Sequence, residues 1–164
     1  MNEQIFSFPP ILATHPGILI LGTMPSVASL LAAEYYGNPK NAFWRILSAI
    51  HGIDCPTDYK SKIQLITDMN LALWDICHTC IRPGSADSDI RNEEPNPVKE
   101  LLAAHPSIHT LLFNGKTAEK LFRSHFKTIA GINMATLPST SPAYTLPFEQ
   151  KLAAWTLMIQ PDKK

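Results

Sequence analysis

The chain has 164 residues, of which 45% are apolar, 14 are basic and 14 are acidic, so its formal net charge at pH 7 is zero. This length suits one domain spanning 1–164, and the apolar fraction is too high for a disordered chain. The zero net charge argues against a broadly basic nucleic-acid binder, although a neutral molecule can still carry a local basic patch. No apolar run approaches the roughly 18 residues that cross a bilayer, and the proline-containing N-terminus is unlike a secretory signal. We therefore expect a cytoplasmic protein (nucleoid-associated in a prokaryote) without a membrane partner.

Strand-like and helical patterns alternate along the chain. An apolar run at 18–22 predicts the first strand, which the turn GTMPS and a short helix from Ser26 follow. Later runs predict strands at 71–76, 108–115 and 134–138, and helical patterns occupy 43–50, 97–105, 116–126 and 148–159. Such alternation is typical of an α/β fold in which helices cover both faces of a parallel sheet.

Ligands of open parallel sheets bind beyond the carboxyl ends of the strands. Four polar segments follow the four predicted strands, and they are GTMPS (22–26), CHTCIRPGSADSDI (77–90), FNGKT (113–117) and PSTSPAY (138–144). We expect these segments to share one rim with GNPKN at 37–41. The rings of Tyr35 and Tyr36 just before GNPKN suit stacking on a flat ligand such as a nucleobase.

Each polar candidate has a structural alternative. GTMPS lacks both common phosphate-binding glycine patterns, so Ser26 could simply cap a helix. Asn41 and Asn114 each precede a predicted helix, where asparagine is a good N-cap. The acidic stretch that begins at Asp87 is expected to be mostly a solvated face, whereas Asp75 lies closer to a strand end.

The three cysteines, Cys55, Cys77 and Cys80, are too few and odd in number for a disulfide framework. The C-x-x-C at 77–80 would need both His78 and Cys55 to complete a zinc site, and an iron–sulfur cluster needs a fourth cysteine. Packing is the favoured interpretation and metal or redox use the alternative. We expect no metal and no cofactor.

Five ordered pieces together resemble one family. GTMPS, YYGNPKNAFW, LALWDI with RPGSADSDI, FNGKTAEKLF and LPSTSPAY occur in this order in the uracil-DNA glycosylase superfamily. The chain is most similar to the hypoxanthine-DNA (deoxyinosine) glycosylase branch, from about Phe6 to about Trp155. The resemblance implies a three-layer α/β/α sandwich with a short parallel four-stranded sheet. It also implies a monofunctional base-excision repair enzyme that flips a deaminated base from double- or single-stranded DNA and hydrolyses its N-glycosidic bond. A monomer is the default expectation for the oligomeric state.

The resemblance assigns roles by position, with Asn41 as the catalytic residue. The base-binding residues are Gly22, Thr23, Met24, Tyr36, Phe43 and Asn114. The DNA-binding residues are Pro25, Ser26, Lys40, Ser85, Lys116, Pro138, Ser139, Thr140 and Ser141. The chain departs from its relatives at Met24, which stands where mismatch-specific uracil glycosylases carry a water-activating residue. It also departs at Leu137, where many relatives are polar, and at Asn38, where a histidine is common.

These observations predict a DNA glycosylase with hypoxanthine preferred and uracil allowed. A module of the same fold that binds nucleic acid or a nucleotide without cleavage is the alternative that Met24 supports. An unrelated hydrolase on an α/β scaffold is the third, and the five ordered motifs argue against it. Hypoxanthine, uracil and xanthine differ in their polar edges, and Asn114 is the candidate reader of that edge.

Overall fold

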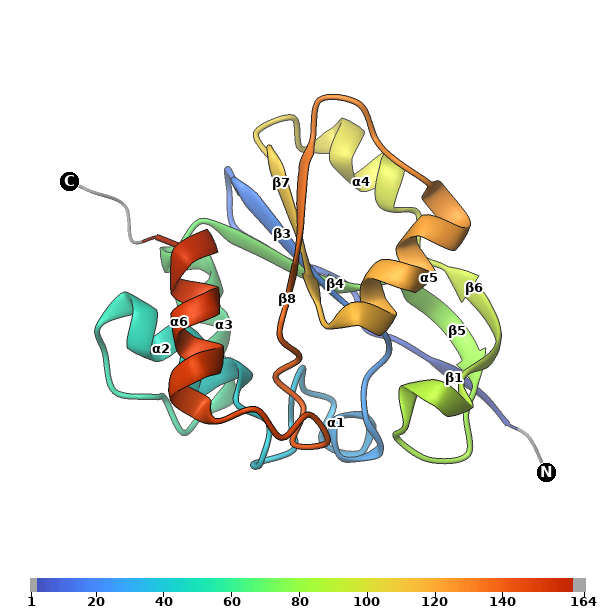
Figure 1. Cartoon of the computed structure of the whole chain (residues 1–164), viewed down its shortest axis with the longest axis horizontal. Helices are drawn as coiled ribbons and strands as arrows, with labels where there is room; N and C mark the ends of the chain where they lie inside the picture. The colour runs from blue at the N-terminus through green and yellow to red at the C-terminus, as the bar shows by residue number, and fades with distance from the viewer. Residues whose placement is uncertain (1–2, 161–164) are drawn as a thin grey trace.

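The computed structural model describes residues 3–160 and is built around a five-stranded sheet (Figure 1). The strand order is β2-β4-β3-β7-β8. The bounds are Ile11–Leu12 for β2, Ile18–Gly22 for β3, Leu71–Asp75 for β4, Thr110–Asn114 for β7 and Asn133–Leu137 for β8. The four predicted strands are confirmed and run parallel, while β2 adds an antiparallel edge beside β4.

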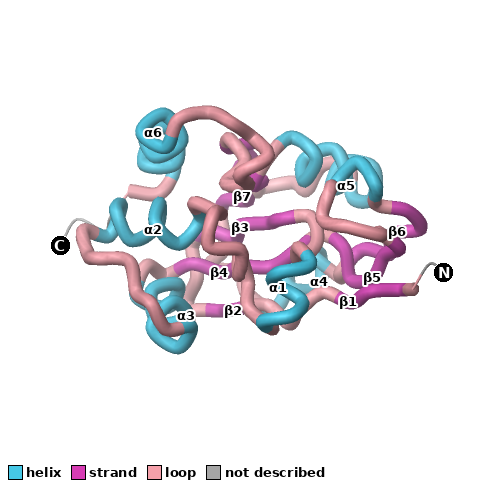
Figure 2. The backbone as a smooth tube through the Cα atoms, turned by 90° about the horizontal axis from the view of Figure 1, so that it is seen from below, coloured by secondary structure: helices cyan, strands magenta, loops and turns pink. Residues whose placement is uncertain are grey.

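Helices cover both faces of this sheet, so the predicted three-layer sandwich is confirmed (Figures 1 and 2). One face carries α2 (Phe43–His51), α3 (Tyr59–Asp68) and α6 (Phe148–Met158), and the other carries α4 (Val98–Ala104) and α5 (Lys116–Phe126). The alternation of strand side chains explains the two cores, because Ile20 and Leu112 point to the first face and Leu21 and Phe113 point to the second.

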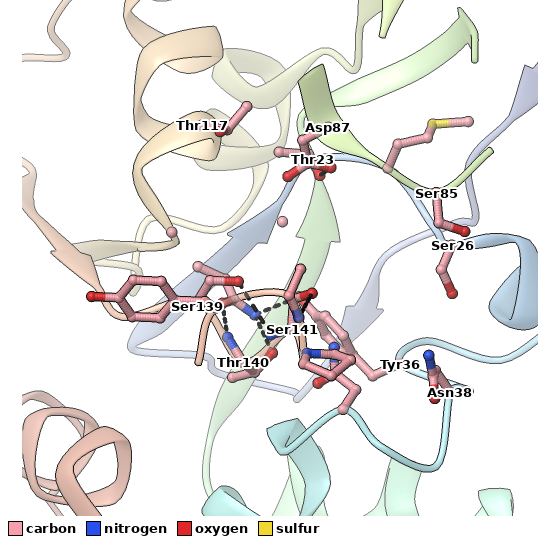
Figure 3. A pocket seen from close by; sticks show the side chains of 18 of the residues that line it. Thr23, Ser26, Tyr36, Asn38, Ser85, Asp87, Thr117, Ser139, Thr140 and Ser141 are labelled. Carbon is pink, nitrogen blue, oxygen red and sulfur yellow. Dashed lines mark hydrogen bonds between the residues drawn. The ribbon is translucent and has the colours of Figure 1, made fainter. Parts of the chain in front are cut away.

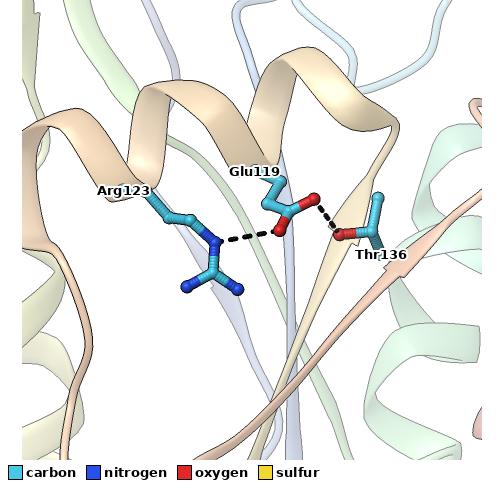
Figure 4. A network of polar contacts seen from close by, with 3 residues as sticks. All are labelled: Glu119, Arg123 and Thr136. Atoms are coloured by element: carbon cyan, nitrogen blue, oxygen red, sulfur yellow. Dashed lines mark hydrogen bonds and ion pairs between the residues drawn. The ribbon is translucent and has the colours of Figure 1, made fainter.

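The edge strand β8 is held to α5 by a polar contact outside the two cores (Figure 4). The Glu119 carboxylate accepts hydrogen bonds from Thr136 Oγ1 at 2.8 Å and from Arg123 Nε at 2.9 Å. An exposed ion pair contributes little stability by itself. The hydrogen bond between Glu119 and Thr136 links α5 to the edge strand β8.

A second, three-stranded antiparallel sheet has the order β1-β5-β6, with β1 at Gln4–Phe6, β5 at Cys77–Ile81 and β6 at Arg91–Pro95. The prediction that 77–81 is part of a loop is therefore wrong. The strand forms because it pairs on both sides with short segments remote in sequence, and this pairing leaves no local pattern. Cys77 and Cys80 are buried against Met24, as the packing interpretation predicts. Within residues 3–160 no group of three or more His, Cys, Asp and Glu side chains could hold a metal ion.

Two helices differ from the sequence prediction. The short helix expected from Ser26 is α1 at Val27–Ala32, and it ends early because Ala33 adopts a left-handed φ of 55°. Helix α3 was not predicted, since it buries only Leu65 and Ile66 and so has a weak apolar periodicity. Within residues 3–160, no helix combines the length and the apolar content that crossing a membrane requires.

Candidate active site

The carboxyl ends of β3, β4, β7 and β8 open onto a cavity of about 850 Å³, as the strand-end rule predicts. In Figure 3 polar side chains surround an open centre, with Thr23 near Asp87 on one side and Thr140 and Ser141 on the other. The principal lining segments are 22–26, 35–36, 85–88, 114–117 and 136–144, together with Asn38, Asn41 and Asp75.

Asn41 lies at the wall of this cavity, one residue before Ala42, which caps α2. Its Oδ1 accepts a hydrogen bond of 2.9 Å from the backbone N–H of Phe43, so it also ties down the first turn of the helix. Among the described residues its Nδ2 has no hydrogen-bond partner, and an amide oxygen has a second lone pair. Asn41 can therefore orient a water or a polar ligand group, although an amide is a poor general base.

Tyr36 presents its ring to the cavity and Phe43 supports that ring from behind. The two rings stack with centroids 4.1 Å apart and an interplanar angle of 27°. Phe43 is 0% exposed and is not among the lining residues, so its predicted direct contact with a base does not fit its position. Tyr36 holds a positive φ of 51°, which costs a non-glycine residue about 1 kcal/mol. Tyr35, its neighbour, is buried and donates its hydroxyl to the Pro9 carbonyl at 2.8 Å.

Asn114 lines the cavity and is held in place by three hydrogen bonds within the protein. Its Nδ2 donates to the Tyr36 hydroxyl at 3.1 Å and to Thr140 Oγ1 at 3.0 Å, and its Oδ1 accepts from the Thr140 backbone at 2.9 Å. The N-cap of α5 is Gly115, so the alternative role of Asn114 as a helix cap is wrong. These three bonds make Asn114 a positioning residue that fixes the Tyr36 ring and the loop after β8.

The sequence prediction of the site missed Asp75, the last residue of β4. Its side chain is 4% exposed and lines the cavity, and within the described part of the chain its Oδ2 has no hydrogen-bond partner. Burial and the nearby Asp87 raise the pKa of the Asp75 carboxyl to about 7, against a lowering by Arg82. An acidic residue directly after the apolar run 71–74 was the signal available in the sequence.

Gly22 is required by the close approach of this carboxyl. Gly22 and Asp75 are partners in the parallel ladder between β3 and β4. A Cβ at Gly22 would lie 2.5 Å from Asp75 Oδ1 and 2.9 Å from the Tyr36 hydroxyl. The glycine therefore leaves the space in which the acid and the phenol approach each other at the base of the cavity.

The loop after β5 is held against GTMPS, and Asp87 is the exception to an acidic stretch that is otherwise mostly exposed, as predicted. Thr23 Oγ1 donates to Asp87 Oδ1 at 2.8 Å, and the Val27 N–H donates to Ser85 Oγ at 2.9 Å. Arg82 donates to the carbonyls of Pro25 and Gly84. Burial raises the pKa of Asp87, while its bond from Thr23 and the charge of Arg82 lower it. Asp87 is thus a second carboxyl at the cavity wall.

The remaining predicted residues divide into three groups. Those that line the cavity are Met24, Pro25, Ser26, Ser85, Lys116, Pro138, Ser139 and Ser141. Thr140 also borders it but is 1% exposed, so it acts mainly through its bonds to Asn114. Lys40 lies outside the cavity, in an adjacent hollow. Met24 offers only a thioether, and Ser26 accepts from the Ser29 N–H at 3.1 Å as the cap of α1.

The fold and the cavity define an α/β protein with a ligand site at the carboxyl ends of parallel strands. Comparison with known families is more specific, because the model of the uracil DNA glycosylase superfamily matches residues 9–159. The chain belongs to that superfamily.

Its relatives point to one branch. A hypoxanthine DNA glycosylase of Methanosarcina barkeri is 32% identical over 94% of this chain and 96% of its own length. A second protein of that name, from Methanosarcina acetivorans, is 36% identical over 83% of this chain and 85% of its own length. A solution NMR structure of a candidate uracil DNA glycosylase from Methanosarcina acetivorans superposes with a TM-score of 0.81 at 31% identity, covering 96% of this chain and 98% of the other.

Proposed function

We propose that the protein is a base-excision repair glycosylase that accepts a deaminated base, hypoxanthine in preference to uracil, and hydrolyses its N-glycosidic bond. One observation carries the proposal. The Asn41 amide has a free N–H pair at the wall of a cavity that also contains the Tyr36 ring. A flat base against that ring would leave its sugar near the mouth, and Asn41 would orient the attacking water.

The chemistry suits a site without a strong base. Loss of a base passes through an oxocarbenium-like sugar, and the departing purine carries the electrons of the broken bond. Water then needs orientation more than deprotonation, which an amide can supply. Hypoxanthine supports this charge better than adenine, and a mispaired base costs less to flip.

Asp75 is a further candidate, beside Asn114, for contact with the polar edge of the base. With a pKa of about 7, much of the carboxyl is protonated at neutral pH. A neutral carboxyl can donate to a ring carbonyl and accept from the neighbouring ring N–H, which is the pair that hypoxanthine and uracil both present. The position of Asp75 in the cavity lining supports this assignment.

The oligomeric state of the protein and the strandedness of its DNA substrate are further parts of this proposal. It works as a cytoplasmic monomer, with residues 1–164 as a single domain. It accepts a deaminated base in double- or single-stranded DNA. Size-exclusion chromatography with light scattering, and cleavage of the same lesion in either form of DNA, would test these points.

Binding without cleavage is the second candidate, and Met24 favours it. Met24 is 6% exposed and packs against Cys77 and Cys80, so it cannot hold a water. That candidate requires Asn41 to have no effect on the chemistry, so the two functions differ in one measurable outcome.

A single-turnover assay on a duplex carrying one deoxyinosine or one deoxyuridine separates them, with alkali to reveal abasic sites. We expect the wild type to cleave the inosine strand and Asn41→Ala to cleave it about 10²–10³-fold more slowly, as when an oriented polar group is lost. Asn133→Ala, which removes an exposed amide on β8 outside the cavity, is the matched control. DNA binding without product in the wild type would establish the binding module instead.

A further inference from the structure

A second hollow of about 200 Å³ lies beside the cavity and shares Thr140, Pro142 and Tyr144 with it. Three of its lining residues are cations from three parts of the chain: Lys40 before α2, Arg45 within α2 and Lys151 within α6. Among residues 3–160, no carboxylate lines the hollow. Its charge is therefore positive, although the chain as a whole is neutral.

Lys151 is the unusual member of this set, because its side chain is 4% exposed. Its Nζ donates to the Ser141 carbonyl at 3.1 Å and lies 5.5 Å from the centroid of the Tyr144 ring. An ammonium has three donors, and neither ion pair found among residues 3–160 includes this one. Burial and the charge of Arg45 both lower the pKa of Lys151.

Arg45 is exposed and is oriented by an aromatic ring rather than by an acid. Its guanidinium carbon lies 5.4 Å from the centroid of Phe148, the first residue of α6. Lys151 is a buried cation without an ion-pair partner among residues 3–160, which is costly for the protein alone, and the like charge of Arg45 adds to that cost. The cost is relieved when a dianionic or monoanionic oxygen-rich group enters, because charged N–H donors match its oxygens.

We propose that this hollow binds a phosphate of the DNA backbone next to the flipped nucleotide, with Lys40, Arg45 and Lys151 as its ligands. The assignment to DNA rests on the proposed function, whereas the anion site rests on the hollow itself. The bound phosphate would also order the loop 138–147, because Lys151 holds that loop through Ser141. Backbone contact would then be coupled to the shape of the cavity wall at Thr140.

The test combines protein variants with neutral phosphates in the DNA. The DNA is a short duplex with one abasic-site analogue, so that contacts with a flipped base do not contribute to binding. Its affinity for the protein is measured by fluorescence anisotropy between 50 and 200 mM KCl. Arg45→Ala and Lys151→Met are compared with the wild type and with Lys99→Ala, an exposed residue of α4 that lines neither hollow. The phosphates flanking the abasic site are replaced one at a time by methylphosphonates.

We expect Arg45→Ala and Lys151→Met each to weaken binding about tenfold and to reduce the slope of log K against log[salt] by about one. One methylphosphonate should weaken the wild type by a similar factor but have little further effect on either variant, because both changes remove the same contact. Lys99→Ala should match the wild type. The Arg45 side chain is exposed, so Arg45→Ala should fold normally and tests the site even if Lys151→Met does not fold.

Unchanged salt slopes in both variants would overturn the proposal. The proposal would also be wrong if every methylphosphonate weakened DNA binding by the same factor in the wild type and in the variants. If no single methylphosphonate matters but inorganic phosphate raises the Tm of the wild type and not of Lys151→Met, the hollow binds a free anion and its assignment to DNA is wrong. Cleavage of deoxyinosine by the wild type is scored separately, so failure of the glycosylase proposal is distinguished from failure of the phosphate site.

Discussion

Asp75→Asn should make the protein more stable at alkaline pH, although it removes a charge from the site. The substitution keeps the shape of the side chain and replaces an acid by a neutral amide. Burial, followed by the charge of Asp87, raises the pKa of the carboxyl from its ordinary value of 3.8 to about 7. A rise of about 3 corresponds to about 4 kcal/mol of free energy against the ionised native state, at 1.36 kcal/mol for each pKa unit.

The sign of this effect follows from proton binding. Between pH 4 and 7 the native state holds a proton on Asp75 that the unfolded chain has lost, so the stability due to this group falls as the pH rises. The loss is complete above about pH 7 and absent below about pH 4. Relative to wild type, Asp75→Asn should therefore gain up to about 4 kcal/mol at pH 8 and little at pH 4.

Urea unfolding at pH 4.5, 6, 7 and 8 measures the difference directly, with the midpoint and the m-value fitted at each pH. Asp89→Asn, which neutralises an exposed carboxylate in the loop after β5, is the control and should shift stability by less than about 0.5 kcal/mol at every pH. A difference between Asp75→Asn and wild type that stays constant from pH 4.5 to 8 would refute the reasoning. It would mean that ionisation of the Asp75 carboxyl does not destabilise the native state.

Two further predictions concern the residues around Asp75. Gly22→Ala places a Cβ 2.5 Å from Asp75 Oδ1 and 2.9 Å from the Tyr36 hydroxyl. It should lower the free energy of unfolding by about 1–3 kcal/mol and slow cleavage. If urea unfolding shows wild-type stability for this variant, the floor of the cavity is not tightly packed. Asn114→Leu leaves the Thr140 N–H without its acceptor and removes a donor to the Tyr36 hydroxyl. The free energy of unfolding should therefore fall by about 2–3 kcal/mol. Thermal unfolding measures this, and an unchanged Tm would contradict the role of Asn114 as a bridge between Tyr36 and Thr140.

Much of the fold was predictable because its elements are continuous in the sequence. The apolar runs ending at Gly22 and Asn114 and the amphipathic pattern at 116–126 are local signals, and the alternation of such signals defines a parallel sheet with helices on both faces. The second sheet gave no such signal. Strand β5 forms between segments near residues 5 and 93, and neither pairing is visible in the five residues of β5.

The site was predictable as a set of segments and less so as a set of roles. The strand-end rule places Asn41, Tyr36 and the loop after β8 around one cavity, because parallel strands end at the same edge. The sequence could not show that Phe43 supports Tyr36 from behind, because either aromatic ring can pack in a core or stack on a flat ligand. Which ring faces the cavity depends on the left-handed backbone of Tyr36 and on the direction in which α2 begins.

The sequence by itself determined the fold class, the family and the segments that meet at the cavity, since these depend on local periodicity and on ordered motifs. Only the tertiary structure decided how the polar groups are shared. Asn114 uses both of its amide protons within the protein. Within the part of the chain that the structure describes, Asp75 keeps an oxygen without a hydrogen-bond partner and Lys151 is buried without a counter-ion. Hydrogen bonding and desolvation depend on neighbours that are remote along the chain, so the environment of each group is a property of the folded molecule.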